Sequence, residues 1–380
     1  MNELSHKLIL DNYLDSSGKI KEEFKYKINI PELKIKDSKF IPNPGDKFET
    51  MLFLPPNSNR IAEGGLRTKG FFKFSYKKVR SKKLEVRNDL EKKNKNINES
   101  GDVWYICDFY GNPLIPVPSS HLSLLTSHLS LLTSSLLTSF PLITVITVVY
   151  NGAKYLEDTI KSVINQTYPN VEYIIIDGGS KDGTIDIIKK YDDYIDYWVS
   201  EPDKGIYDAM NKGVIVSTGN YLYFMGSSDK IFSTSTIFFI LSKINFRVIE
   251  NLLACAIKIS HKNQPSYPKL SNNIPIIHHQ GALFNLGKLK EIGFYDLNYK
   301  IFSDFDLILR YIKRNGVCYI DTVACEFQVG GISTSRKDLL LKLKEYSTIY
   351  LKYGGRITDG RFLLAITRIL YYYFKGILKS

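Results

Sequence analysis

The sequence predicts an α/β fold with a doubly wound, mostly parallel sheet in residues 141–335. Short apolar runs rich in β-branched residues recur along this part of the chain, as is typical of strands that are buried on both faces. Segments with apolar residues at helical spacing separate these runs. Polar residues follow each run at its carboxyl end, where open α/β sheets bind their ligands. These three features predict flanking helices on a parallel sheet, with a site along one edge.

The predicted elements follow one another along the chain. The first strand is PLITVITVV at 141–149, and the helix after it ends before Pro169, because apolar residues recur between them at helical spacing. The remaining elements are a strand at 171–177, a helix at 185–191, a strand at 195–200 and a strand at 221–225. The alternation of strands and helices favours a parallel sheet over a β-sandwich.

Composition bounds the class of protein. A chain of 380 residues predicts two or three domains, and 44% hydrophobic with 24% charged residues is typical of a globular protein. The formal net charge of +12 favours an anionic partner: a nucleotide, a nucleic acid or a membrane surface. The four cysteines lack CxxC spacing, so they indicate neither a zinc site nor a disulfide framework. The first residues, MNELSHKLILDNYLDSSGK, do not have the pattern of a signal peptide.

A repeat precedes the first predicted strand. The unit HLSLLTS occurs at 121–127 and again at 128–134, and no charged side chain occurs from Phe109 to Ala153. More than half of residues 121–140 are Ser, Thr or His, whereas a membrane span needs ~20 predominantly apolar residues. A coiled coil needs more sustained heptads with charged flanking positions. We therefore interpret residues 111–140 as a linker that contains the repeat.

Polar residues gather after four of the predicted strands. Asp177, at the end of the second strand, could accept a hydrogen bond from a base or ribose, and Lys204 could offset phosphate charge. Asp229 offers the oxygen ligand that a hard cation bridging a diphosphate requires. Neither GxGxxG nor GxxxxGK[ST] is present, which argues against a dinucleotide fold and a P-loop. The candidates for a nucleotide site are Tyr150, Asn151, Asp177, Asp203, Lys204, Ser228 and Asp229.

Long motifs carry a resemblance to a known family. ITVVYNGAKYLEDTIKSVINQTYPNVEYIIIDGGSKDGT, SEPDKGIYDAMNKGV and STGNYLYFMGSSD resemble, in this order, the family 2 glycosyltransferases over roughly 141–335. The nearest branch builds bacterial O-antigen, capsule and colanic-acid-type polysaccharides. The resemblance implies a GT-A fold and an inverting transferase of class EC 2.4. Such an enzyme moves a hexosyl or N-acetylhexosaminyl group from a nucleotide sugar, with UDP expected, to a glycan or lipid-linked acceptor.

The resemblance also implies roles for donor-side residues. Tyr150 and Asp177 are expected to line the nucleotide pocket, and Asp203 to lie in the donor-site loop. Asp229 belongs to a DxD-like motif that would hold Mg²⁺ or Mn²⁺. Relatives commonly have two adjacent acids in this motif, whereas this chain has GSSDK at 226–230.

This departure leaves three alternatives open. Asp229 binds metal alone, with the diphosphate supplying other ligands. Alternatively, the site is metal-poor, with Lys230 near the phosphates. In the third, the protein is an impaired, nucleotide-sugar-binding pseudoenzyme. A nucleic-acid-binding protein is a further alternative raised by the net charge, but no known motif supports it, and we expect no nucleic-acid partner.

Two further motifs concern the acceptor side. HHQGALF at 278–284 resembles the segment that leads to the acceptor, which makes His279 and Gln280 candidates there. SDFDLILR at 303–310 resembles the element whose first Asp is the general base, here Asp304. Asp306 lies two residues further on near a helix start and points in a different direction, so only one of the two can serve. Outside this motif, Asp304 would be interpreted as a helix N-cap.

The flanking regions are less specific. Residues 1–110 have no assignable fold, although EGGLRTKG at 63–70 resembles a segment that in relatives lies shortly before the first strand. Residues 67–95 contain twelve basic and three acidic residues, which favours a solvated face or an approach to anionic lipid.

Residues 336–380 are expected to form C-terminal helices. The last twenty, RFLLAITRILYYYFKGILKS, carry four basic residues and no acid, with a broad apolar surface if helical. This pattern is typical either of a core helix with basic edges or of a helix lying on an anionic membrane. The second interpretation suits a lipid-linked acceptor. It predicts a cytoplasmic protein that binds peripherally to the inner face of the cell membrane.

Overall fold

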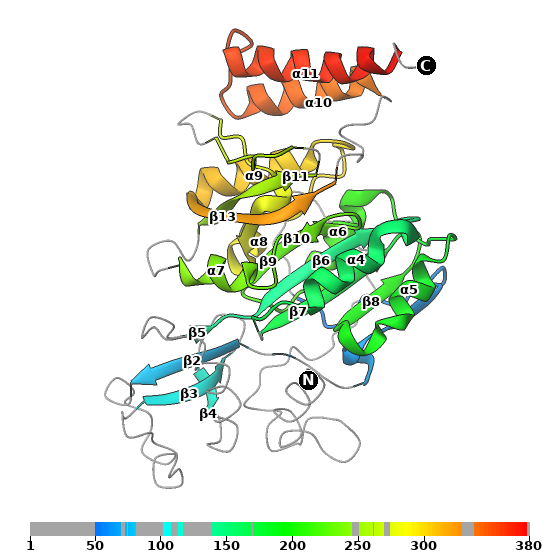
Figure 1. The fold of residues 1–380 in the computed structure, drawn as a ribbon, viewed down its shortest axis with the longest axis vertical. Coiled ribbons are helices and arrows are strands. Elements are labelled where there is room, and N and C mark those ends of the chain that lie inside the picture. Colours follow the sequence, from blue (N-terminus) through cyan, green and yellow to red (C-terminus); the bar gives the residue numbers. More distant parts are fainter. Residues whose placement is uncertain are drawn as a thin grey trace.

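The computed structural model describes residues 50–69, 73, 75–80, 102–107, 113–116, 139–168, 170–244, 251–260, 262–269, 274–328 and 338–377. They form a large sheet flanked by helices, a separate small sheet and a pair of C-terminal helices (Figure 1). Residues 1–49 and the repeat at 121–134 lie outside the described residues, so the expectations for them stay predictions.

The large sheet has nine strands. In chain order they are β1 (Ala62–Gly64), β6 (Ile143–Val149), β7 (Val171–Asp177), β8 (Tyr197–Ser200), β9 (Tyr221–Gly226), β10 (Lys230–Ile231), β11 (Leu252–Ile259), β12 (Ala282–Asn285) and β13 (Val317–Phe327). Their order in space is β1-β8-β7-β6-β9-β12-β11-β13-β10. The pairs β6–β7, β6–β9, β7–β8 and β11–β13 are parallel and the other four are antiparallel. All strands except β1, β10 and β12 therefore run in one direction, which confirms the doubly wound, mostly parallel sheet.

Helices cover both faces of this sheet. They are α4 (Ala153–Ile164), α5 (Thr184–Lys190), α6 (Ile206–Ile215), α7 (Thr236–Ser242), α8 (Leu286–Ile292) and α9 (Ser303–Asn315). Apolar residues of α4, α5 and α7 pack on one face, and those of α6, α8 and α9 pack on the other.

Strand β6 shows why its sequence, ITVITVV, is mostly apolar. Ile143, Val145 and Val149 of β6 belong to the first apolar cluster, whereas Ile146 and Val148 belong to the second. Alternate side chains point to opposite faces of a strand, so a strand covered on both faces carries apolar residues toward both. The buried Thr144 and Thr147 of β6 are hydrogen-bonded within the protein. The predicted βαβαβ order and the strand at 221–225 are confirmed.

Residues 50–69 join the same sheet, although the sequence places the boundary of this domain at 141. Ala62, Glu63 and Gly64 pair antiparallel with β8. Arg67 is buried, at 3% exposure, and its guanidinium group donates to the carboxylate of Glu172 on β7. Arg67 therefore ties the N-terminal segment to the centre of the sheet. The prediction that it lies on a solvated or lipid-facing surface is wrong, because a buried carboxylate needs it as a counter-charge.

An insertion separates residues 50–69 from β6. It contains β2 (Ser75–Arg80), β3 (Asp102–Cys107), β4 (Pro113–Pro116) and β5 (Ser139–Phe140), which form an antiparallel sheet in the order β4-β3-β2-β5. Both β4 and β5 fall within the predicted linker at 111–140, so part of that segment is folded. The small sheet lies at the opposite end of the molecule from the C-terminal helices (Figure 1).

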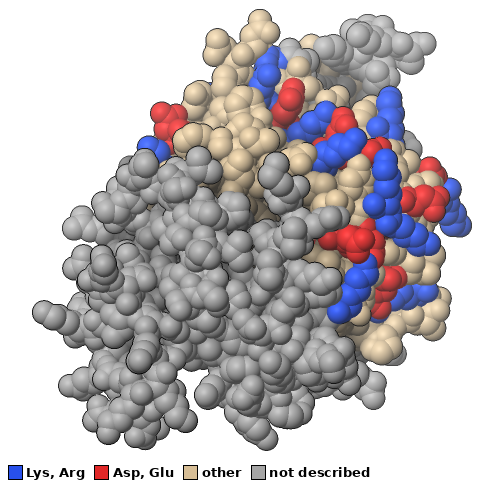
Figure 2. All heavy atoms as spheres, turned by 60° about the horizontal axis from the view of Figure 1, so that its bottom comes forward, with Lys and Arg blue, Asp and Glu red and all other residues tan. Residues whose placement is uncertain are grey.

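Acidic residues of the large domain neutralise the start of the basic run. The Lys69 ammonium group lies 2.5 Å from carboxylate oxygens of Asp192 and Asp193, and that of Lys73 lies 2.8 Å from Asp196. Seen from this end of the molecule, the described Lys and Arg side chains are interspersed with Asp and Glu (Figure 2). The described part of this face therefore carries charges of both signs.

The last two helices are α10 (Leu339–Lys352) and α11 (Gly360–Ile377), which confirm the predicted C-terminal helices. They lie side by side beyond α9 (Figure 1). Phe362 of α11 packs against Tyr346 and Tyr350 of α10.

We predict that Arg67→Ala lowers the free energy of unfolding by ~3–5 kcal/mol, because it leaves the Glu172 carboxylate buried without a counter-charge. Lys69→Ala removes a more exposed pair and serves as the matched control, with an expected loss below ~1 kcal/mol. Urea unfolding of both variants measures the difference. Equal, small losses would show that the N-terminal segment does not depend on this ion pair.

Candidate active site

The four parallel strands β6–β9 end at one edge of the sheet. In the register of the ladder, Val149 lies opposite Asp177, which lies opposite Ser200, and Val148 lies opposite Gly226. The turns that follow these strands are therefore neighbours. The structure brings together the polar segments that the sequence placed at 150–151, 177–180, 203–204 and 228–229.

Asp177 lies beneath this edge and is fully buried. Its carboxylate accepts the backbone N–H of Gly179 at 3.1 Å and of Ser180 at 2.9 Å. It also accepts the hydroxyl groups of Ser180 and Ser200. Four donors within the protein match the acceptor capacity of a carboxylate. Asp177 therefore shapes the 178–180 turn, whereas the sequence predicted that it would accept from a base or ribose.

The turn after β6 presents Tyr150 to solvent. Asn151 has a positive φ of 51°, a conformation that Asn adopts more readily than most residues. Its N–H donates to the Ser180 hydroxyl at 2.7 Å, and its side-chain oxygen accepts the N–H of Lys181 at 2.9 Å. Asn151 thus locks two turns together and leaves the Tyr150 side chain 66% exposed at the rim.

Gly178 lets Tyr150 and Asp203 approach each other. A Cβ atom on Gly178 would lie 2.5 Å from Oδ2 of Asp203 and 3.4 Å from the ring of Tyr150. Asp203 is half-buried, and its Oδ1 accepts the N–H of Gly205 at 2.8 Å. Burial raises the pKa of Asp203, and the negative charges of Asp208 and Asp177 add to this. Lys204 is exposed beside it.

Asp229 follows β9 and is 2% exposed. Its oxygens accept the N–H of Gln328 at 3.0 Å and of Gly226 at 3.2 Å, and burial raises its pKa to about 6. No Lys, Arg or His in the described part of the chain forms an ion pair with it. Ser228 is half-buried next to it, and the Lys230 ammonium group lies 2.7 Å from Asp158 on α4.

Asp304 lies in the first turn of α9 and is partly exposed. Its Oδ1 accepts the N–H of Phe305 at 2.9 Å and lies 3.1 Å from the hydroxyl oxygen of Tyr207. Burial raises the pKa of Asp304 to about 6, although these hydrogen bonds lower it. The N-cap position is Phe302, so Asp304 is not the N-cap.

Tyr207 is a residue that the sequence analysis missed. It lies in the first turn of α6, directly after the loop that carries Asp203, and within the matched stretch SEPDKGIYDAMNKGV. Its hydroxyl group lies 2.6 Å from the carbonyl oxygen of Ile301, closer than to Asp304. The single hydroxyl hydrogen cannot serve both acceptors fully. Tyr207 therefore joins the segment before α9 to the Asp304 carboxylate.

Asp306 points away from Asp304, as predicted. It is fully buried and accepts hydrogen bonds from the ammonium group of Lys352 at 2.8 Å and the hydroxyl of Tyr353 at 3.0 Å. Arg310 forms a further ion pair with it at 3.3 Å. Because cations neutralise Asp306, Asp304 is the acid of the pair that remains available as a base.

His279 supports the site from within the core. It is 4% exposed, and its Nε2 lies 2.7 Å from the hydroxyl oxygen of Tyr295. Tyr295 in turn stacks on Tyr207, with ring centroids 5.6 Å apart. Burial lowers the pKa of His279 to about 4, so it is neutral at pH 7. The structure therefore places His279 in the core behind Tyr295 and Tyr207, while Gln280 next to it is half-buried.

Comparisons with known proteins point to one family. The model of the family described as glycosyl transferase family 2 matches residues 144–243. An uncharacterized glycosyltransferase of Mycobacterium tuberculosis is 30% identical over 240 residues, which cover 60% of this chain and 92% of the relative. A PGL/p-HBAD biosynthesis glycosyltransferase of Mycobacterium bovis is 26% identical over 208 residues, covering 52% of this chain and 81% of the relative.

Solved structures with a similar arrangement share little sequence. Staphylococcus aureus TarS 1–349 in complex with UDP is 17% identical, covers 61% of this chain and 70% of that one, and has a TM-score of 0.43. The mannosyltransferase PcManGT from Pyrobaculum calidifontis in complex with GDP-Man and Mn²⁺ is 16% identical. It covers 66% of this chain and 76% of that one, with a TM-score of 0.46.

We predict that Tyr207→Phe raises the pKa of Asp304 further above about 6, because the hydrogen bond from Tyr207 favours the charged carboxylate. Carbon-detected NMR titration of the Asp304 carboxyl group measures this shift directly. Tyr194→Phe changes an exposed tyrosine and is the control. An unchanged or lower pKa in Tyr207→Phe would show that Tyr207 does not stabilise the ionised form.

Proposed function

The chain belongs to glycosyl transferase family 2, and we propose that it is an inverting glycosyltransferase that moves a sugar from a nucleotide sugar to a hydroxyl group of a glycan or lipid-linked acceptor. The observation that carries this proposal is the environment of Asp304. It is a partly exposed carboxylate with a pKa of about 6, held by Tyr207 from the helix that follows the Asp203 loop. Raised carboxylate pKa values are typical of general bases.

We assign the donor to the edge formed by the turns after β6, β7 and β8. Tyr150 offers an exposed aromatic ring against which a nucleotide base can stack. It lies next to Asp203 and Gly178. Lys204 is exposed at the same loop and can offset phosphate charge. Asp177 and Asn151 contribute by holding these turns in place. UDP is the nucleotide we expect.

The proposed reaction is a single displacement at the anomeric carbon. Asp304 takes the proton of the acceptor hydroxyl group. The oxygen of that hydroxyl forms the new bond to the anomeric carbon, while the bond from this carbon to the diphosphate breaks. The electron pair leaves with the nucleoside diphosphate. A base with a pKa near 6 is largely ionised at pH 7, yet accepts a proton more readily than an ordinary Asp.

Asp229 is the residue that would hold Mg²⁺ or Mn²⁺ on the donor diphosphate. Its buried carboxylate has no cationic partner among the described residues, and a metal ion would supply the missing counter-charge. A single carboxylate suits a cation that takes its other ligands from phosphate and water. When bound, such an ion neutralises charge on the leaving diphosphate. Lys230 is a weaker candidate, because its ammonium group pairs with Asp158.

The first functional prediction concerns the base. Asp304→Asn should lower kcat by ~10²-fold or more while donor affinity stays nearly the same, since a base acts in the transition state. Thermal shift across nucleotide sugars identifies the donor, and product formation is then measured with that donor. Asp186→Asn, on the exposed side of α5, is the control. Donor binding by the wild type without transfer would instead support a pseudoenzyme, and normal turnover in Asp304→Asn would exclude this base.

The second prediction concerns the metal. Asp229→Ala should weaken donor binding and remove its dependence on Mn²⁺ or Mg²⁺, because the protein ligand is lost. Calorimetric titration of the donor with Mn²⁺ or with EDTA measures both effects. Asp158→Asn, an exposed acid near the same turn, should keep the metal dependence. Wild-type donor affinity that is the same in EDTA would contradict a metal site at Asp229.

We propose that α11 places the enzyme on an anionic membrane that carries a lipid-linked acceptor. Leu363, Leu364 and Tyr371 are about half exposed along one side of α11, with Arg368 exposed among them. Apolar side chains with basic neighbours are typical of interfacial helices. Within the described residues, no helix has the length and apolar character needed to span a bilayer. A peripheral enzyme on the inner face of the cell membrane, acting in O-antigen, capsule or related polysaccharide synthesis, fits this surface.

The third functional prediction concerns this surface. Replacing Leu363, Leu364 and Tyr371 together by Ser should weaken binding to vesicles of phosphatidylglycerol by ~10-fold or more, because apolar burial and basic charge act together. Co-sedimentation at low and high salt measures the binding. Phe239→Ser on α7 is the control, since Phe239 is 50% exposed away from α11. Equal binding of the triple variant and the wild type would refute the assignment.

A further inference from the structure

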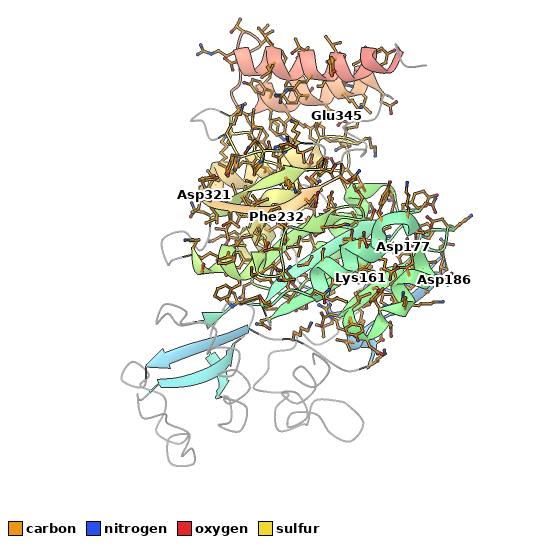
Figure 3. All side chains as sticks on the ribbon, viewed as in Figure 1. Lys161, Asp177, Asp186, Phe232, Asp321 and Glu345 are labelled. Atoms are coloured by element: carbon orange, nitrogen blue, oxygen red, sulfur yellow. The ribbon has the colours of Figure 1, made fainter. Side chains whose placement is uncertain are left out.

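A buried carboxylate on α10 contacts the backbone just before the helix that carries Asp304. Glu345 is 3% exposed and lies between α10 and the rest of the domain (Figure 3). One of its oxygens accepts the N–H of Lys300 at 2.8 Å. The other accepts the N–H of Ile301 at 2.9 Å and of Phe302 at 3.1 Å.

These three amides are adjacent to the N-terminus of α9. The N-cap residue Phe302 has no side chain that can cap the helix, so the donors at this end need acceptors from elsewhere. A carboxylate is the favoured partner, because it also interacts with the positive end of the helix dipole. Glu345 therefore binds the backbone that leads into α9, including the N–H of its N-cap residue Phe302.

We propose that Glu345 is a positioning residue for Asp304, so that α10 is part of the catalytic unit. This proposal rests on the function proposed above. The carbonyl group of Ile301, whose own N–H is bound by Glu345, accepts from the hydroxyl of Tyr207 at 2.6 Å. Tyr207 is also the group that lies 3.1 Å from the carboxylate of Asp304. Glu345 thus holds the backbone segment that precedes Asp304 and accepts the hydrogen bond of Tyr207.

Other contacts hold α10 against the same turn of α9. Tyr346, next to Glu345, stacks on Phe305 with ring centroids 5.5 Å apart and contacts Phe302 edge-on at 5.8 Å. Lys352 and the adjacent Tyr353 bind Asp306. Contacts along the length of α10 therefore fix the first turn of α9, and a displacement of α10 would carry Asp304 with it.

The charge of Glu345 also reaches Asp304. Burial raises the pKa of Asp304, the hydrogen bond from Tyr207 on α6 lowers it, and the negative charge of Glu345 on α10 raises it. Tyr295, whose pKa is raised by burial and by the charge of Asp304, is a further titratable group near this carboxylate. Removing the charge of Glu345 should therefore lower the pKa of Asp304 and move the acid limb of the kcat profile to lower pH.

The test compares Glu345→Gln with Asp359→Asn. Asp359 accepts from the hydroxyl of Tyr350 on α10 and from the N–H of Arg356, so its replacement loosens the connection between α10 and α11 without touching α9. We expect Glu345→Gln to lower kcat by ~10-fold or more with an unchanged KM for the donor, because small misplacements of a catalytic group cost rate. We also expect its acid limb to move to lower pH. Asp359→Asn should lower Tm while leaving kcat and the pH profile as in the wild type.

Two readouts keep the outcomes distinct. If Glu345→Gln and Asp359→Asn show the same kcat and the same acid limb, Glu345 has a structural role only and the inference fails. NMR titration of the Asp304 carboxyl in folded Glu345→Gln needs no activity, and an unchanged pKa also counts against the inference. If the wild type transfers no sugar from any donor, the proposed function fails, while this titration still tests the link between Glu345 and Asp304.

Discussion

Burial of both faces of the parallel strands β6–β9 is the constraint on which the rest of the structure depends. Side chains along these strands enter one of two apolar clusters, so groups that meet a ligand are confined to the strand ends. The two threonines of β6 are paired within the protein. Thr144 donates to Glu172, which Arg67 neutralises, and Thr147 lies 3.1 Å from the hydroxyl of Tyr173. The polar turns of the candidate site therefore gather at the ends of these strands.

At that edge and around it, aspartate residues have different roles that depend on their neighbours. Asp177 meets four donors and organises a turn, and Asp306 meets Lys352 and Arg310 and anchors a helix. Asp229 and Asp304 have neither four hydrogen-bond donors nor cationic partners among the described residues, and burial raises the pKa of both to about 6. The carboxylates left incompletely satisfied by the protein are those suited to bind a cation or accept a proton.

The flanking segments extend this unit in opposite directions. Residues 50–69 complete the large sheet at β1, after which the insertion with β2–β5 leads away from the domain and returns at β6. At the other end, Glu345 of α10 contacts the segment just before α9, while α11 presents apolar side chains outward. A surface proposed to meet the membrane and a contact proposed to position the base thus belong to one pair of packed helices.

The sequence by itself determined the α/β class and the order of β6 to β9 along the chain, because hydrophobic periodicity is a local property. The choice of Asp304 over Asp306 came from the resemblance of SDFDLILR to a family motif and stays a prediction. The sequence also located the polar turns, although it did not separate Asp177, which the protein satisfies internally, from residues free to meet a ligand. Only the tertiary structure decided that Arg67 is buried against Glu172, a partner 105 positions away. The same holds for Tyr207, 97 positions from Asp304, and for Glu345, which lies 44 positions from Ile301. A buried carboxylate or amide accepts whichever partner the packed chain brings to it, and no local pattern in the sequence records that partner.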